Sequence, residues 1–329
     1  MRVLRFLGYS VLVILALLAG AVGAVWYFNP FAPPVVVSDP GPNGRRVTDN
    51  GLIANYYPAS GEGKHPAILL LGGSEGGIGT GVARMAAALH EQNYAVLNLS
   101  YFRAPGQTEK LERVPLELFD RALDWLKIQP DVDVERMAVV GGSKGAEAAL
   151  IVATRHPELR AVVAGMPSSV AWQGVDWNVM NYILNPPGGS WALDGKPIPF
   201  VPFVKTFSKD LLQLYTDSLA QLPNHQDAII PIEVSHASVL LICGKDDALW
   251  PSCTMAEQVK ARADAHQGPT VTVLAYDHAG HGGVFGVPLE TTNPNYNALA
   301  SLGGTADGNN AARIDGWPKV LQHLETALK

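Results

Sequence analysis

The chain has 329 residues, a formal net charge of −6 and 16% charged residues. This length suits one α/β domain built on a single sheet. The weakly acidic balance provides no basic patch, so nucleic acid is not an expected partner.

An apolar run from Phe6 to Phe28 contains no charged residue and follows Arg2 and Arg5. As a helix it would be roughly 34 Å long, enough to cross the hydrocarbon core of a bilayer. We therefore predict that residues 1–29 form a single-pass transmembrane anchor. The positive N-terminus places the following domain outside the cytoplasm. A cleavable signal is the alternative, because residues 21–24 offer small side chains at a cleavage site; the protein would then be exported.

Residues 30–45 are rich in Pro and Gly and are predicted to form an extended linker. Asn50-Gly51 then predicts a β-hairpin. Further along, short apolar runs alternate with helical patterns, which predicts an α/β fold with a doubly wound, mostly parallel sheet in one domain, residues 46–329. The expected strands are 67–71, 94–99, 138–140, 161–164, 239–242 and 271–274, and the expected helices 82–92, 115–129, 144–156, 256–266 and 314–328.

Residues 166–235 interrupt this alternation with several large aromatic side chains, two Pro-containing stretches and a predicted helix near 209–219. A long excursion between two sheet strands is where a lid or cap emerges. We predict a cap insertion here. Our hypothesis is that its aromatic residues cover an apolar substrate pocket.

Cys243 and Cys253 are the only cysteines, too few for a disulfide framework. Packed thiols are one interpretation. A disulfide in an exported chain is the other, and the sequence leaves both open.

Ser143 lies in Gly141-Gly142-Ser143-Lys144-Gly145, after an apolar run and directly before a helix-forming run. This is the strand, sharp turn and helix of a nucleophile elbow. A serine hydroxyl is a weak nucleophile near neutral pH, so it needs a histidine base and a carboxylate that orients the histidine. The pattern predicts a serine-dependent acyl transfer or hydrolysis enzyme.

The partners of Ser143 are expected in loops that leave later strands, in the order Asp and then His. Gly244-Lys245-Asp246-Asp247 follows one apolar run, and Asp247 is the predicted orienting acid, with Asp246 as its alternative. His281 follows the next run in Ala279-Gly280-His281 and is the predicted base, because the small residues before it let the loop turn back. His278 is the alternative base.

Gly72-Gly73-Ser74-Glu75-Gly76 also fits Gly-x-Ser-x-Gly, but a loose glycine-rich loop follows it instead of a helix. This loop position conventionally supplies one backbone N–H of an oxyanion hole, and the residue after the nucleophile supplies the other. We therefore assign backbone N–H groups near Ser74 and at Lys144 to that hole. A turn that only packs against the sheet is the alternative for Ser74. Phosphate-binding and metal-binding spacings are missing, so no cofactor and no metal are expected.

Together these segments resemble the α/β-hydrolase catalytic domain shared by acyl-CoA thioesterases and bile acid-CoA:amino acid N-acyltransferases. The similar stretches are Ser143 to Glu147, Gly244 to Asp247 with Trp250-Pro251-Ser252, Ala279 to His281 and Ala312 to Trp317, within a likeness covering residues 47–329. The resemblance implies an α/β-hydrolase fold and an acyl-enzyme on Ser143.

The expected function is a serine-dependent acyl hydrolase or acyltransferase that acts on small-molecule thioesters, such as acyl-CoA-like compounds, or on esters. One alternative is a carboxylesterase or dienelactone-hydrolase-like enzyme for small esters. The other is an inactive, membrane-anchored binding protein with the hydrolase fold, against which the complete Ser, His and Asp set argues.

Overall fold

The body of the molecule is an eight-stranded sheet with strand order β1-β2-β4-β3-β6-β7-β10-β11. The computed structural model describes residues 2–30, 32–205 and 210–329. The strands are β1 (Arg45–Val47), β2 (Ile53–Tyr57), β3 (His65–Leu71), β4 (Ala95–Ser100), β6 (Val132–Gly142), β7 (Leu159–Gly165), β10 (Ser238–Gly244) and β11 (Val271–Tyr276). From β4 to β11 neighbouring strands are parallel, whereas β2 is antiparallel to β1 and β4. The predicted mostly parallel sheet is confirmed.

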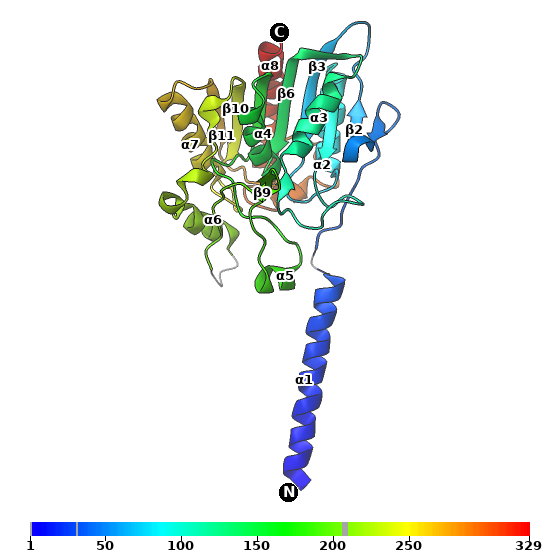
Figure 1. Ribbon diagram of the computed structural model, residues 1–329, viewed down its shortest axis with the longest axis vertical. Helices are drawn as coiled ribbons and strands as arrows, with labels where there is room; N and C mark the ends of the chain where they lie inside the picture. The colour runs from blue at the N-terminus through cyan, green and yellow to red at the C-terminus, as the bar shows by residue number, and fades with distance from the viewer. Residues whose placement is uncertain (1, 31, 206–209) are drawn as a thin grey trace.

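Helices cover both faces of this sheet, as the nearly continuous apolar strands require. One core lies under α3 (Glu117–Lys127), α4 (Lys144–Arg155) and α7 (Ser252–Ala265), and the other under α2 (Thr80–Glu91) and α8 (Ala306–Ala327). Figure 1 shows α3 and α4 in front of the strands and α8 behind them. The doubly wound arrangement brings the carboxyl ends of the parallel strands, and the loops that leave them, to one edge.

Two local predictions differ from the structure in their boundaries. β1 and β2 form the hairpin predicted at Asn50-Gly51, but Val47 pairs with Ala54, so the loop is longer than two residues. A short 3-10 helix, Asp49–Gly51, occupies it. The last helix begins at Ala306, earlier than predicted, because the Thr305 side chain accepts the Gly308 N–H at 2.9 Å and caps the helix.

In the described residues between β7 and β10, the α-helices are α5 (Val179–Leu184) and α6 (Leu211–Leu219), and short 3-10 helices follow α6. A small sheet joins β8 (Trp191–Leu193) and β9 (Lys196–Pro197) to β5 (Val114–Pro115). Trp172, Tyr215 and Trp250 pack edge to face, with ring centroids 5.0 and 5.4 Å apart along this series. These aromatic side chains form a core of their own.

The N-terminal helix α1 (Arg2–Phe28) forms as predicted and extends away from the body (Figure 1). It meets α5 at Trp26, whose indole N–H donates to Asn181 Oδ1 at 2.8 Å and whose carbonyl accepts the Asn178 amide at 2.9 Å. Among the described residues, no helix combines the length and apolar content needed to cross a membrane. The transmembrane segment predicted within residues 1–29 is therefore not supported.

In the segment predicted as a linker, residues 30–45, residue 31 lies outside the described residues, and the part from 32 to 45 is docked on the domain. Val37 pairs with Ile78 in a parallel bridge, and the Ile78 N–H donates to the Val36 carbonyl at 2.8 Å. The Arg103 guanidinium also donates to the Pro33 carbonyl at 2.8 Å. The polypeptide thus enters the sheet beside the glycine-rich loop that follows β3.

Cys243, near the end of β10, and Cys253, in the first turn of α7, form a disulfide. Of the two interpretations that the sequence left open for these cysteines, packed thiols are therefore wrong. It closes the loop that carries Asp246 and Asp247.

Candidate active site

Ser143 occupies the sharp turn between β6 and α4, with φ 55° and ψ −122°. A positive φ is strained for a residue with a side chain, and tight surrounding packing must hold it. A Cβ at Gly141 would lie 2.1 Å from the Gly145 carbonyl oxygen, and one at Gly145 would lie 2.3 Å from that of Gly72. Only glycine fits at both positions, so the backbone can close the turn that exposes the Ser143 hydroxyl to the cavity above the sheet.

A continuous hydrogen-bond chain joins the three residues predicted to act together. Ser143 Oγ lies 2.8 Å from His281 Nε2, and His281 Nδ1 lies 2.9 Å from Asp247 Oδ2. All three residues are buried. A carboxylate on Nδ1 favours the imidazole tautomer whose Nε2 is free to accept the serine proton, so this chain can activate the hydroxyl.

The Asp247 carboxylate is fixed by three further donors. Its Oδ1 accepts the backbone N–H groups of Leu249 at 2.9 Å and Trp250 at 3.1 Å. Its Oδ2 accepts the Ser252 hydroxyl at 2.6 Å. Sequence reasoning gave Ser252 no role, although it lies in the segment that carried the family likeness.

The two alternative residues lie outside this chain. Asp246 is exposed, and its nearest histidine nitrogen, Nδ1 of His278, is 3.8 Å away. The His278 side chain is 80% exposed. Neither side chain reaches Ser143 or His281 by a hydrogen bond among the described residues.

The loop that carries His281 is braced by residues near the C-terminus. The His281 N–H donates to the Leu302 carbonyl at 2.9 Å, and the Gly280 N–H donates to Asn309 Oδ1 at 2.9 Å. Asn309 is fully buried and also donates to the carbonyls of Gly303 and Thr305. Sequence reasoning missed Asn309 because a single asparagine in a helix has no pattern that marks such a contact.

Of the two backbone groups proposed for an oxyanion hole, Ser74 lines the cavity and Lys144 directly follows the cavity-lining Ser143. Lys144 begins α4, where the first N–H groups have no intrahelical acceptor. Among the described residues, no acceptor is recorded for the Ser74 N–H, whereas the preceding Gly73 N–H donates to Glu75 Oε1 at 3.2 Å. Ser74 also accepts the Trp177 indole N–H at its carbonyl, at 2.8 Å.

Tyr101 fixes the loop that carries Ser74. Its hydroxyl donates to the carbonyls of Gly72 at 2.7 Å and Gly73 at 3.1 Å. Burial raises the pKa of Tyr101 well above its ordinary value, with a smaller contribution from the charge of Glu75. The hydroxyl therefore stays protonated and keeps donating across the physiological pH range. The sequence gave no sign of this role.

Below the elbow, the Lys144 side chain forms a fully buried ion pair with Glu147 at 2.9 Å. Lys144 Nζ also donates to Ser190 Oγ at 2.9 Å. The other Glu147 oxygen accepts the Trp172 backbone N–H at 2.9 Å and the Trp191 indole N–H at 2.7 Å. Burial lowers the pKa of Lys144, and the Glu147 carboxylate opposes that change.

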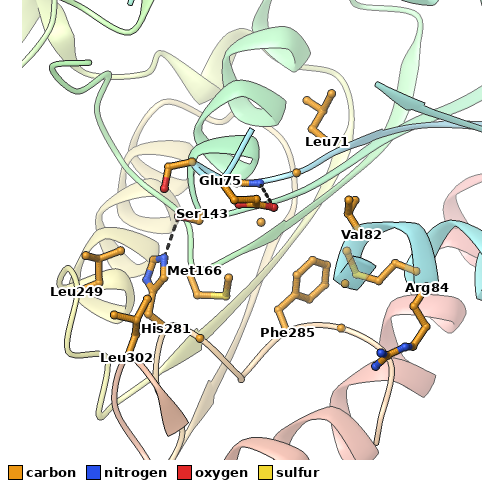
Figure 2. Close-up of a pocket in the computed structure, with 18 of the residues that line it drawn as sticks. Leu71, Glu75, Val82, Arg84, Ser143, Met166, Leu249, His281, Phe285 and Leu302 are labelled. Carbon is orange, nitrogen blue, oxygen red and sulfur yellow. Dashed lines mark hydrogen bonds between the residues drawn. The ribbon is translucent and has the colours of Figure 1, made fainter. Parts of the chain in front are cut away.

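A cavity of about 270 Å³ opens at Ser143 and His281 (Figure 2). Its apolar wall includes Val82, Met85 and Phe285. From the described part of the insertion at 166–235, Met166 lines it. Trp172 and Tyr215 of the insertion pack in a separate core, whereas the Trp177 indole donates to the carbonyl of the cavity-lining Ser74. That the insertion's aromatic residues cover this pocket stays a prediction.

The arrangement of sheet, elbow and hydrogen-bond chain agrees with a family-level comparison. Residues 114–329 match the model of the family described as BAAT / Acyl-CoA thioester hydrolase C terminal. The chain belongs to this family. The matched region contains Ser143, Asp247 and His281, and the suspected resemblance is confirmed.

Curated relatives extend the likeness towards the N-terminus. Acyl-coenzyme A thioesterase 1 of Rattus norvegicus is 24% identical over 289 residues, which is 83% of this chain and 62% of the relative. Acyl-coenzyme A thioesterase 6 of Mus musculus is 26% identical over 285 residues, 86% of this chain and 64% of the relative. The chain thus spans less than two thirds of the length of these relatives.

Solved structures share the fold at low sequence identity. A putative dienelactone hydrolase from Klebsiella pneumoniae has a TM-score of 0.52 and 16% identity, covering 86% of this chain and 97% of its own. The carboxylesterase EstE1, cloned from a metagenomic library, has a TM-score of 0.52 and 14% identity, covering 91% and 92%. The α/β-hydrolase fold is therefore confirmed.

Proposed function

We propose that this protein is a serine-dependent acyl hydrolase that cleaves a thioester or ester through an acyl-enzyme on Ser143. The observation that carries the proposal is the hydrogen-bond chain from Asp247 through His281 to the Ser143 hydroxyl at the cavity. Family membership supports it, because the family is described by acyl-CoA thioester hydrolysis.

In the first half of the reaction, Ser143 Oγ attacks the acyl carbonyl carbon while His281 Nε2 takes the hydroxyl proton. The new C–O bond leaves negative charge on the former carbonyl oxygen. Backbone N–H groups at Lys144 and near Ser74 are suited to stabilise that charge. When the intermediate collapses, the bond to the thiol or alcohol breaks, and His281 returns the proton to the leaving group.

In the second half, water attacks the acyl-enzyme and His281 takes one of its protons. Collapse of this second intermediate breaks the ester bond to Ser143, returns the proton to the serine oxygen and releases the carboxylic acid. An amine in place of water would give an amide. The Asp247 carboxylate stabilises the imidazolium that forms in each half.

Turnover of thioester and ester substrates by the full chain and by Ser143→Ala tests the assignment. Loss of the nucleophile should lower kcat by about 10³-fold or more. Ser74→Ala is the matched comparison, because Ser74 lies in the second Gly-x-Ser-x-Gly motif and the change keeps its backbone N–H; it should lose far less. Labelling by a fluorophosphonate should mark the peptide that contains Ser143. Equal turnover by wild type and Ser143→Ala would refute the proposal.

We further propose that the domain lies outside the cytoplasm. Arg2 and Arg5 precede the apolar helix, and the Cys243–Cys253 disulfide suits an oxidising compartment. Protein expressed in a bacterial host should resist thiol alkylation when residues 1–29 are present and react when they are absent. The N-terminal sequence of the mature protein separates an anchor from a cleaved signal. Reactive thiols in both forms would contradict the proposal.

A further inference from the structure

The cavity has a second polar region besides Ser143 and His281. Arg84, from the first turns of α2, and Arg313, from α8, both line it. In Figure 2, Ser143 and His281 lie on one side of Phe285 and Arg84 on the other. Two arginines that are far apart in the sequence therefore line the same cavity.

The Arg313 side chain is held in place by hydrogen bonds to backbone carbonyls of another loop. Its Nε donates to the Gly283 carbonyl at 2.5 Å and its Nη1 donates to the Val287 carbonyl at 3.3 Å. A Cβ at Gly286 would lie 3.4 Å from Arg313 Cζ, so the guanidinium packs closely on that loop. In this position Nη2 has no hydrogen-bond acceptor among the described residues.

The positive charges of this pair are not balanced locally. In the part of the chain that the structure describes, neither Arg84 nor Arg313 forms an ion pair with a carboxylate. Glu75 is the acidic residue of the cavity wall, and its carboxylate accepts the Gly73 N–H beside the elbow instead.

Burial, and then the charge of Arg84, lowers the pKa of Arg313 to about 10. Arg313 therefore stays protonated at neutral pH, and the charge of Arg84 opposes its own. Partly buried charges are normally paired, because removal from water is costly. A guanidinium group is also the side chain best shaped to bind a carboxylate or phosphate through two parallel hydrogen bonds. The missing partner is thus an anion.

Resting on the proposed function, we propose that Arg84 and Arg313 bind an anionic group of the substrate, a carboxylate or a phosphate, while the scissile carbonyl lies at Ser143. The wall between the two ends is apolar, with Val82 and Phe285, so a short hydrocarbon segment should join the anion to the carbonyl. The cavity of about 270 Å³ is slightly smaller than most ligand pockets, which measure roughly 300–1,000 Å³, and this favours a compact substrate.

The test compares mono-para-nitrophenyl esters of dicarboxylic acids, from glutaric to suberic acid, with the same compounds capped as neutral methyl esters. Wild-type protein should have a kcat/KM about 10- to 100-fold higher for the best anionic ester than for its neutral counterpart. Arg84→Met should reduce that ratio at least tenfold, Arg84→Lys should keep part of it, and Arg84→Glu should reverse it.

The matched control is Arg121→Met, on exposed α3 surface away from the cavity, which should leave the ratio unchanged. A wild-type ratio near one, or a ratio that Arg84→Met and Arg84→Glu do not alter, would overturn the inference. Loss of all turnover in Ser143→Ala with a ratio near one in wild type would retain the proposed function and reject only this inference.

Binding without turnover provides the second measurement. Ser143→Ala is titrated with monomethyl glutarate, monomethyl adipate, methyl phosphate and inorganic phosphate. If the two carboxylates bind more tightly than the two phosphates, and Arg84→Met raises their Kd at least tenfold, the substrate carries a dicarboxylic acyl group. If methyl phosphate binds more tightly than the carboxylates, and Arg84→Met raises its Kd at least tenfold, the substrate is phosphorylated. Binding of none of these, or binding that Arg84→Met leaves unchanged, would contradict the arginine site.

Discussion

Asp246 and Asp247 are adjacent in the chain, but only one of them has the surroundings of a catalytic carboxylate. Both are carboxylates in the same loop after β10, and composition alone cannot separate them. In the structure, Asp247 faces inward and accepts donors from Leu249, Trp250 and Ser252 as well as His281. Asp246 faces solvent. The two aspartates differ in the hydrogen bonds that surround them. Those hydrogen bonds depend on tertiary contacts, which the sequence does not reveal.

We expect Asp247→Asn to lower kcat by about 10²–10⁴-fold, because an amide cannot stabilise the imidazolium and favours the wrong tautomer of His281. Asp246→Asn is the matched control and should change kcat less than about threefold, since surface substitutions away from the site have small effects. Steady-state kinetics on one ester, with thermal melts of both variants, provides the measurement. The reverse order of effects would transfer the role to Asp246.

At the scale of elements, the Lys144–Glu147 pair attaches the insertion to the helix that follows the nucleophile. Both residues lie in the first turn of α4, and their charged groups bind Ser190 and both Trp172 and Trp191. The insertion therefore serves as a support for the elbow. Tyr215 and Trp250 continue this contact to His281, whose ring lies 5.2 Å from that of Trp250.

Removal of one member of a buried ion pair leaves the other charge uncompensated, which costs about 3–5 kcal/mol. Glu147→Gln should therefore destabilise the protein by about that amount. The double variant Lys144→Met/Glu147→Gln should lose less than the sum of the two single changes.

The exposed pair Lys260–Asp264 in α7 supplies the control. Asp264→Asn should cost less than about 1 kcal/mol, because solvent screens that pair. Urea unfolding of Lys144→Met, Glu147→Gln, the double variant and Asp264→Asn measures these differences. Equal losses for Glu147→Gln and Asp264→Asn would show that the buried pair does not hold the insertion.

Across the whole molecule, the sequence predicted what local patterns control. Strands buried on both faces must be apolar throughout, so the runs at 67–71, 138–140 and 239–242 fall within β3, β6 and β10. Ser143 was identifiable because the elbow needs glycine at fixed spacing beside it. These features depend on neighbours in sequence.

Features that depend on distant segments could not be predicted in the same way. Arg84 and Arg313 reach one cavity wall from α2 and α8. Arg84 lies in no recognisable motif, and the stretch Ala312 to Trp317, which carried part of the family likeness, gave no sign that Arg313 faces the cavity. The aromatic residues of the insertion suggested a lid, but Trp172 and Tyr215 bury their apolar surface against each other. Hydrophobicity indicates that a ring is buried without indicating which partner buries it.

Gly145 lets the elbow and the glycine-rich loop touch backbone to backbone, since a Cβ there would lie 2.3 Å from the Gly72 carbonyl oxygen and 2.6 Å from that of Leu71. Neither loop can shift without moving the other. A substitution that changes the backbone of one loop must therefore be compensated in the other. The start of α2 is not restricted in this way, because a Cβ at Gly81 would meet no atom within 4 Å. Substitutions in the part of the cavity wall that α2 contributes can therefore change which compound binds, while the nucleophile turn and the loop after β3 stay the same.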